Sequence, residues 1–479
     1  MTLRTEAAAG VRWSSIAIGG KYGVGLLTTI VLVGLLDPAD FGLLAMAIVF
    51  VELASLFYDL GTSAAIVQRP ALSDRLLSSI FWVNAGLGLL CTVILIAVAP
   101  LLALLFNEPR LEPFVSLLAL TVAISGLSVV HAALARRNLA FSTVARVELA
   151  AVLLGAVVGI TSAVLGKGAW SLVYQALTVS CVSTLGWWIA VRWRPGLVIS
   201  WDALRGVAGF SLNLTGFSIV NFAARRADYL LIGGYLGATA LGYYTLAYKI
   251  VLYTVQCFSS AITRVMFPVY SKIQADHQRL RAAFTKVAVA TAAVVFPAMI
   301  GLMIVAEPLV ALFGEKWAPV AVLLIILAPV GMIQSIVGAL VAIYLAKGRT
   351  GLFFAWGVGA GLVVITGLMI GIRFGVVWTA VSFAVAQLLL VYPSLVIPFR
   401  LIDLPLGQFL SVLRPTLACT AVMGLIVLGI RFLLPPALPP AATLSVLVAA
   451  GIGSYLVSSL LLNRKQTREM LHFALARAA

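Results

Sequence analysis

Long apolar segments, separated by short polar stretches, run through almost the whole of this chain of 479 residues. A helix needs about 20 apolar residues to cross a bilayer core that is about 30 Å thick. Breaks at polar, proline and glycine clusters divide the sequence into about fourteen segments of that length. They are residues 13–36, 41–67, 77–106, 114–135, 145–166, 168–191, 206–236, 240–266, 286–313, 319–346, 351–372, 375–399, 412–433 and 441–463. The sequence therefore predicts an all-α polytopic membrane protein with about 14 transmembrane helices.

Composition excludes a soluble enzyme and a disordered chain. Hydrophobic residues make up 62% of the sequence and charged residues 10%, against about 45–50% and about 25% in soluble domains. The charges are unbalanced, with 32 Lys and Arg against 16 Asp and Glu. In a soluble protein this excess would suggest a nucleic-acid partner. In this chain, the positions of the basic residues relative to the apolar segments decide the interpretation.

The basic residues alternate in density from one predicted loop to the next. If the N-terminus is cytoplasmic, about 23 of the 32 basic residues lie at cytoplasmic positions and about five on the opposite side. This split is the positive-inside pattern of membrane proteins. We therefore expect both termini in the cytoplasm, and the excess of positive charge predicts no nucleic-acid partner.

Two stretches of the chain match later stretches at a nearly constant offset. Gly34–Ala47 aligns without gaps to Gly234–Ala247, and residues 99–120 match residues 307–327. An even number of predicted helices separates the matched positions, so both repeats have the same orientation in the membrane. The sequence predicts two parallel six-helix lobes plus two C-terminal helices. Two such lobes facing a central cavity are typical of alternating access.

The repeat also predicts the division of the chain into domains. We expect an N-lobe, an inter-lobe linker, a C-lobe, two extra helices and a basic cytoplasmic tail. These are residues 1–193, 194–204, 205–400, 401–463 and 464–479, in that order.

Two segments carry a family resemblance. Residues 35–74 resemble the first-to-third-helix region of bacterial polysaccharide exporters, with the sequence LLDPADFGLLAMAIVFVELASLFYDLGTSAAIVQRPALSD. Residues 225–250 resemble their seventh and eighth helices, with the sequence RRADYLLIGGYLGATALGYYTLAYKI. The chain is thus similar to the polysaccharide-transport branch of the multidrug/oligosaccharidyl-lipid/polysaccharide (MOP) exporter superfamily, close to its lipopolysaccharide and colanic-acid exporters.

The resemblance implies a flippase of the bacterial inner membrane. Such a protein moves a polyprenyl-pyrophosphate-linked oligosaccharide from the cytoplasmic to the periplasmic leaflet by alternating access of its two lobes. It implies no cofactor, with a proton or a sodium ion as the coupling ion. Membrane lipids and other polysaccharide-assembly proteins are the further partners that the resemblance implies.

Four basic residues lie inside predicted helices and are candidates to bind the cargo's pyrophosphate. They are Lys21, Arg225, Arg226 and Lys249. A charge inside a membrane costs about 2.5–3.5 kcal/mol on insertion scales and marks a functional site by default. Arg can contact a phosphate with two parallel hydrogen bonds, whereas Lys acts as a point charge. These four residues are therefore the predicted anion-binding set.

Charge pairing between helices is the alternative interpretation of the same residues. Asp228 follows the two arginines closely, and Glu52 is expected at mid-depth in the second helix. Buried Arg–Asp or Lys–Glu pairs could simply hold helices together. Adjacent Arg225 and Arg226 also project about 100° apart on a helix, so both cannot point at one spot.

Three carboxylates inside predicted helices, Glu52, Asp59 and Asp228, are candidates for ion coupling or charge pairing. A carboxylate at depth can take up a proton or ligate a cation. Asp59 lies nearer the cytoplasmic end, where it could instead be an interfacial partner of Arg69 or Arg75.

Two other function classes compete with a flippase. A cation-coupled multidrug antiporter of the same superfamily would favour an acidic cavity, yet the intramembrane charges here are four cations against three anions. A membrane glycan polymerase or ligase would need a large extracytoplasmic loop, whereas the predicted outside loops have about seven residues at most. The spacing of Cys and His predicts no metal site, and no catalytic residue is predicted.

Overall fold

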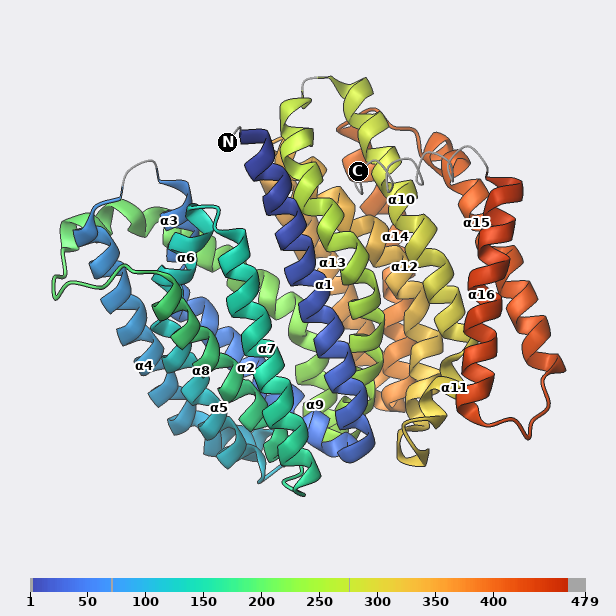
Figure 1. Cartoon of the computed structure of the whole chain (residues 1–479), viewed down its shortest axis with the longest axis horizontal. Helices are drawn as coiled ribbons and strands as arrows, with labels where there is room; N and C mark the ends of the chain where they lie inside the picture. Colours follow the sequence, from blue (N-terminus) through green and yellow to red (C-terminus); the bar gives the residue numbers. More distant parts are fainter. Residues whose placement is uncertain (1–2, 70–71, 275, 464–479) are drawn as a thin grey trace. The chain divides into compact units, whose positions relative to one another are not determined.

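The computed structural model describes residues 3–69, 72–274 and 276–463, with parts of α1 and α9 described by backbone only. Across these residues the chain is α-helical and contains no strand (Figure 1). The predicted tail 464–479 lies outside the described residues. An all-α membrane fold is therefore confirmed.

The helices of the first half have the following bounds: α1 Leu3–Leu35, α2 Pro38–Asp59, α3 Thr62–Gln68, α4 Asp74–Leu105, α5 Leu111–Gly126, α6 Val129–Arg137, α7 Phe141–Val164, α8 Trp170–Ala190 and α9 Trp201–Lys272. Those of the second half are α10 His277–Ile304, α11 Ala306–Ala311, η1 Glu315–Trp317, α12 Pro319–Ala346, α13 Thr350–Gly371, η2 Ile372–Phe374, α14 Val376–Arg400, α15 Leu406–Leu433 and α16 Pro440–Leu462.

Eleven helical segments of the described chain are long and apolar enough to cross a membrane, or twelve if the bent pair α5 and α6 is one span. Within α1, the described apolar part is shorter and covers Gly19–Leu35. The count of fourteen and the cytoplasmic location of both termini stay predictions.

Several predicted helices are interrupted where the backbone leaves the helical region. The predicted helix 41–67 breaks at Leu60 and Gly61, both with positive φ, and so becomes α2 and α3. The predicted helix 114–135 bends by 46° between α5 and α6. A third break agrees with the sequence: Gly237, with φ 81° and ψ 179°, separates the two halves of α9 between the predicted helices 206–236 and 240–266. A glycine adopts this conformation without the steric cost that a Cβ would impose.

Contacts divide the chain into two compact units, Met1–Thr245 and Leu246–Ala479. In the first unit, α2 packs on α4 and α5, α7 packs on α8 and α1, and α5 packs on α8. This division falls inside α9, because the α9 residues before Leu246 pack against α2. The predicted lobes, with their linker at 194–204, stay a prediction.

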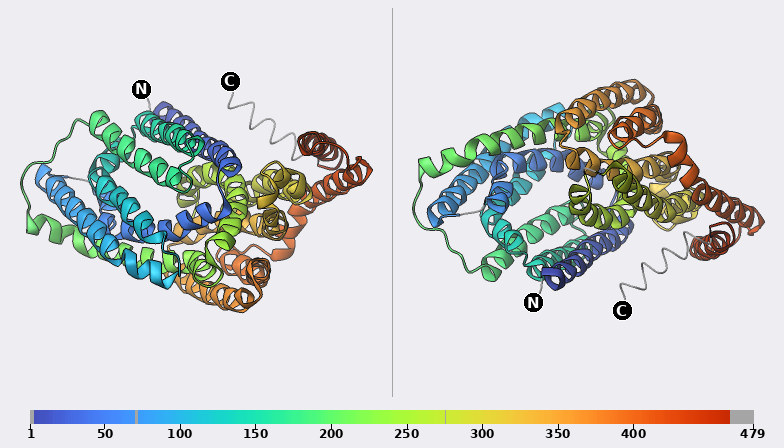
Figure 2. Two further views of the ribbon diagram at one scale, coloured as in Figure 1. Left: turned by 90° about the horizontal axis from the view of Figure 1, so that it is seen from below. Right: turned by 90° about the horizontal axis from the view of Figure 1, so that it is seen from above.

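The second unit repeats the packing of the first. Here α10 packs on α12, α12 on α14 and α13 on α14, as α4 packs on α5, α5 on α8 and α7 on α8. The two extra helices, α15 and α16, lie side by side, and α15 also packs on α10 (Figure 1). The helices of both units are seen end on in Figure 2.

Gly42 of α2 and Gly242 of α9 bring two backbones into direct contact within the first unit. A Cβ at Gly42 would lie 1.7 Å from the carbonyl oxygen of Ala238, and a Cβ at Gly242 would lie 1.8 Å from that of Pro38. The repeat alignment pairs Gly42 with Gly242 and Pro38 with Ala238. Each repeat therefore contacts the other through the same two positions, and we call this contact the glycine crossing.

Candidate functional site

Arg226 and Glu52 form an ion pair that joins α9 to α2. The Arg226 Nε lies 2.8 Å from Glu52 Oε2, and the Nη2 lies 2.7 Å from Oε1. Two parallel N–H···O bonds of this kind are the strongest arrangement that an arginine makes with a carboxylate. The two side chains are 27% and 37% exposed, respectively, so the pair is neither sealed in the protein nor fully open.

Tyr229 lies against the same guanidinium. Its ring centroid is 4.8 Å from Arg226 Cζ, within the range of a cation–π contact. The two residues are three positions apart on α9, a spacing that places side chains on the same face of a helix. The tyrosine therefore orients the guanidinium, and this i, i+3 spacing is the signal by which the sequence could have revealed it.

Asp228 does not share in this ion pair. It is buried and accepts hydrogen bonds from the backbone N–H of Tyr229 at 2.9 Å and from the Tyr244 hydroxyl at 3.1 Å. Tyr244 is itself fully buried and lies beyond Gly237 in α9. The carboxylate thus ties together the two halves of α9, and the charge pairing expected for Arg226 is made by Glu52.

Asp59 holds the break between α2 and α3. It accepts hydrogen bonds from the Ser63 backbone N–H at 3.0 Å, from the Ser63 hydroxyl at 2.8 Å and from the Thr62 hydroxyl at 3.3 Å. The Thr62 hydroxyl in turn accepts from Asn84 Nδ2 at 2.9 Å, which connects the break to α4. The hydrogen bonds to Asp59 use both of its carboxylate oxygens and join the end of α2 to the start of α3.

The ion pair does not include the other three predicted cations. Lys21 of α1 and Arg225 of α9 are exposed, and no ion pair is found for either within the part of the chain that the structure describes. Lys249, half-buried, belongs to the second unit, where its Nζ is 5.5 Å from the Tyr253 ring centroid. The structure therefore brings together Arg226 and Glu52, with Asp228 two residues along α9.

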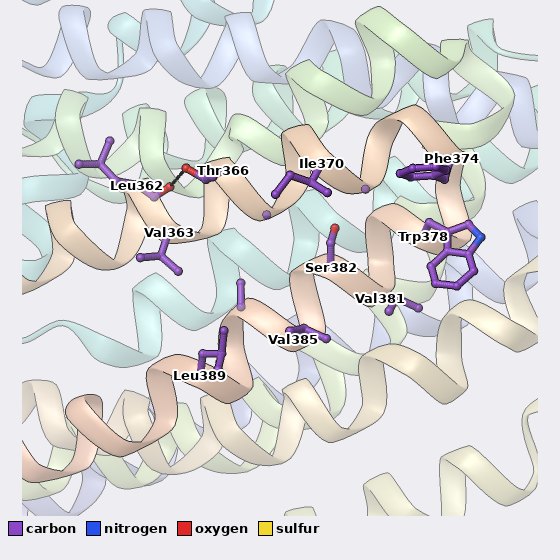
Figure 3. A pocket seen from close by; sticks show the side chains of 13 residues that line it. Leu362, Val363, Thr366, Ile370, Phe374, Trp378, Val381, Ser382, Val385 and Leu389 are labelled. Atoms are coloured by element: carbon purple, nitrogen blue, oxygen red, sulfur yellow. Dashed lines mark hydrogen bonds between the residues drawn. The ribbon is translucent and has the colours of Figure 1, made fainter.

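A groove between α13 and α14 is the wrong kind of site for an anion. It has a volume of about 600 Å³, and its lining is almost wholly apolar, including Leu362, Phe374 and Trp378 (Figure 3). The hydroxyl of Thr366, in the wall of the groove, is bonded to the Leu362 carbonyl at 2.9 Å. With no charged side chain in its lining, the groove suits a hydrocarbon chain and not a phosphate.

We find no candidate metal site among the residues that the structure describes. They contain no group of three or more His, Cys, Asp or Glu side chains placed to hold a metal ion.

Comparison with known proteins gives the family. A family model described as "Polysaccharide biosynthesis protein" matches residues 31–322. The lipopolysaccharide biosynthesis protein WzxC of Escherichia coli K12 is 30% identical over 443 residues, which are 90% of each chain. The succinoglycan biosynthesis transport protein ExoT of Rhizobium meliloti is 28% identical over 480 residues, 98% of this chain and 95% of that one. The teichuronic acid biosynthesis protein TuaB of Bacillus subtilis is 30% identical over 389 residues, 79% of each chain.

Solved structures share the fold. The lipid II flippase MurJ, in an inward closed conformation, matches with a TM-score of 0.75 and 16% identity over 94% of this chain and 98% of that one. The multidrug transporter DinF-BH, of the MATE type, matches with a TM-score of 0.56 over 85% and 99%. The sequence matches, extended over nine-tenths of the chain, show that it belongs to the polysaccharide biosynthesis protein family.

Proposed function

We propose that this protein is a flippase of the bacterial inner membrane. Its cargo is an oligosaccharide linked to a polyprenyl pyrophosphate, which it moves from the cytoplasmic to the periplasmic leaflet by alternating access of its two lobes. The protein is a multi-pass membrane transporter and not an enzyme.

The relatives support this cargo class. They are named for the biosynthesis of lipopolysaccharide, teichuronic acid and succinoglycan, and one of them is named a transport protein. The fold is that of a lipid II flippase over 94% of the chain. Because that structure is only 16% identical, the likeness supports the architecture, while the sequence relatives support the cargo.

The single observation that carries the anion-binding part is the guanidinium of Arg226. It is the second residue of the apolar segment Arg225–Gln256, is partly exposed, and is held in position by Glu52 and Tyr229. A cation in an apolar segment is expensive unless it is used, and a guanidinium matches the oxygen geometry of a phosphate. A fixed positive charge favours an anionic cargo over the cationic drugs of a multidrug antiporter.

We assign supporting roles to the other charges. Arg225, Lys21 and Lys249 are further contacts for the pyrophosphate. Glu52 and Asp228 serve ion coupling, by proton or sodium, or charge pairing. Asp59 is the least suited to coupling, because bonds from Ser63 already use both of its oxygens.

The test is export by Arg225→Ala and Arg226→Ala, singly and combined, in a strain that lacks the native copy of this protein. We expect the double variant to lose at least 90% of export, about 1.4 kcal/mol or more of lost transition-state stabilisation, and to accumulate lipid-linked oligosaccharide. Protein level in the membrane, measured by immunoblot, should stay unchanged.

The matched control is Arg146→Ala, because Arg146 is an exposed arginine near the start of α7 whose Nε bonds to the Ser142 carbonyl of its own helix. It should export normally. Normal export by the double variant at a normal protein level would refute the anion-binding role.

A further inference from the structure

We propose that Glu52 is a built-in competitor of the cargo. In the cargo-free protein it occupies the phosphate-binding edge of Arg226, and the cargo's phosphate must displace it. The Glu52–Arg226 pair is then a latch between α2 and α9 that an anionic cargo opens. This inference rests on the proposed function and adds a regulation of the same site.

The geometry of the pair makes the competition direct. Glu52 engages the edge of the guanidinium formed by Nε and Nη2, with its two oxygens at 2.8 and 2.7 Å. A phosphate that binds an arginine with two parallel bonds uses the same fork of donors. Both anions therefore need the same edge, and the phosphate cannot take it while Glu52 remains there.

Tyr229 keeps the guanidinium in place during the exchange. The ring lies against the guanidinium at 4.8 Å from Cζ and leaves the edge that Glu52 occupies uncovered. Because the tyrosine is on the same helix as Arg226, this contact does not depend on α2. The binding edge therefore stays oriented when Glu52 departs.

The burial of the pair suits exchange. With side-chain exposures of 27% and 37%, the pair can be reached by a second anion. Removing one partner outright from a buried pair leaves an uncompensated charge and is strongly destabilising. Replacing one anion by another keeps Arg226 compensated throughout, and the charge left without its partner is that of Glu52, the more exposed of the two side chains, so cargo opens the latch at a lower cost than thermal opening, which leaves both charges unpaired.

The latch acts on two helices that are already joined elsewhere. The glycine crossing holds the first turns of α2 against α9 through Gly42 and Gly242. Glu52 lies ten residues beyond Gly42, about 15 Å along the helix at 1.5 Å per residue. Opening the latch therefore releases the second half of α2 from α9 while the glycine crossing keeps the first turns of α2 on α9, which is the geometry of a pivot.

The test measures binding of inorganic pyrophosphate to the purified full-length protein in nanodiscs, by isothermal titration calorimetry. Glu52→Gln keeps the shape of the side chain and removes its charge. A hydrogen bond to a charged group contributes about 1.5–3 kcal/mol, so we expect the variant to bind pyrophosphate about tenfold more tightly or better. Adding Arg226→Ala to Glu52→Gln should abolish the gain.

The matched control is Glu148→Gln. Glu148 also faces an arginine of the first unit, with its Oε1 at 3.6 Å from Arg136 Nη2, but it lies outside the pair. Its affinity for pyrophosphate should equal that of the unaltered protein. Glu52→Asp, whose shorter side chain loosens the two-bond fork, should give a smaller gain of the same sign and serves if Glu52→Gln does not fold.

The outcomes separate the latch from the proposed function. Equal or weaker pyrophosphate binding by Glu52→Gln overturns the latch, and so does a failure of both forms to bind. Transport is measured separately, as flipping of lipid-linked oligosaccharide in proteoliposomes of the unaltered protein. If the unaltered protein flips no such lipid, the proposed function is wrong, whereas normal flipping without tighter binding by Glu52→Gln refutes only the latch.

Discussion

Two Arg–Glu pairs in this protein have nearly the same geometry and opposite settings. In the turn between α4 and α5, Arg110 Nε and Nη2 lie 2.8 and 3.0 Å from the oxygens of Glu108. Arg226 and Glu52 repeat this arrangement at 2.8 and 2.7 Å. The first pair joins neighbours in sequence outside the helices, and the second joins residues 174 positions apart on two apolar helices.

The two pairs have similar N–O distances, so the surroundings of an ion pair, and not its bond geometry, decide how much it contributes to stability. Water can replace Glu108 at the Arg110 guanidinium, because the Arg110 side chain is 55% exposed. Such surface pairs contribute about 0–1 kcal/mol to stability. In an apolar segment water is a poor substitute for a carboxylate, so Arg226 needs an anion as its partner. Exchange of one anion for another can therefore regulate this site.

The largest expected effect comes from removing the glycine crossing, which sets α2 on α9 and so positions the intramembrane pair. A Cβ at Gly42 would meet the Ala238 carbonyl oxygen at 1.7 Å, so Gly42→Ala must push the helices apart. We expect a loss of about 3 kcal/mol in the free energy of unfolding, measured by denaturant titration in detergent. Gly34→Ala is the control, because a Cβ there meets no atom within 4 Å. Equal stability of the two variants would contradict the glycine crossing.

A smaller effect should separate the two glutamates. Glu52→Ala leaves Arg226 without its anion, and we expect the free energy of unfolding to fall by about 2 kcal/mol. This is below the 3–5 kcal/mol of a fully buried pair, since both side chains are partly exposed. Glu108→Ala should cost at most about 1 kcal/mol. The same denaturant titration measures both, and equal losses would mean that the membrane setting does not matter.

The smallest effect concerns pH. The hydrogen bond from Arg110 lowers the pKa of Glu108 below its ordinary value of 4.5. A carboxylate with a lowered folded-state pKa adds stability above its ordinary pKa and loses it as the pH falls through the folded-state value. Arg110→Ala should therefore lower the melting temperature slightly at pH 6 and not at pH 3. A difference that is the same at both pH values would show that this pair contributes nothing through Glu108.

The sequence predicted four cations inside helices as a group but could not rank them, and their role as an anion-binding set stays a prediction. Arg226, Arg225, Lys21 and Lys249 have the same signature, a basic residue inside an apolar segment. Only the packing of α2 on α9 distinguishes them, because it gives Arg226 a carboxylate from the other helix and leaves Lys21 and Arg225 exposed. Contacts between residues 174 positions apart leave no local pattern in a single sequence.

The break between α2 and α3 likewise depends on local contacts that the sequence pattern did not reveal. Hydropathy placed the segment 41–67 inside one helix, since its apolar character continues across Leu60 and Gly61. The left-handed backbone there, and the bonds from Thr62 and Ser63 to Asp59, depend on local geometry that hydropathy does not record. Asp59, a coupling candidate in the sequence, accepts these bonds from the start of α3, and its part in coupling stays a prediction.

The sequence by itself determined that this protein lies in a membrane and that it is all-α, and it also revealed the internal repeat and the family. Each of these depends on properties that add up along the chain: apolar length, the count of basic residues in loops, and matches at a constant offset. The tertiary structure decided which charges meet and which glycines let backbones touch. Hydrogen bonds and steric contacts act over a few ångströms, so they exist only once folding has brought distant segments such as α2 and α9 together.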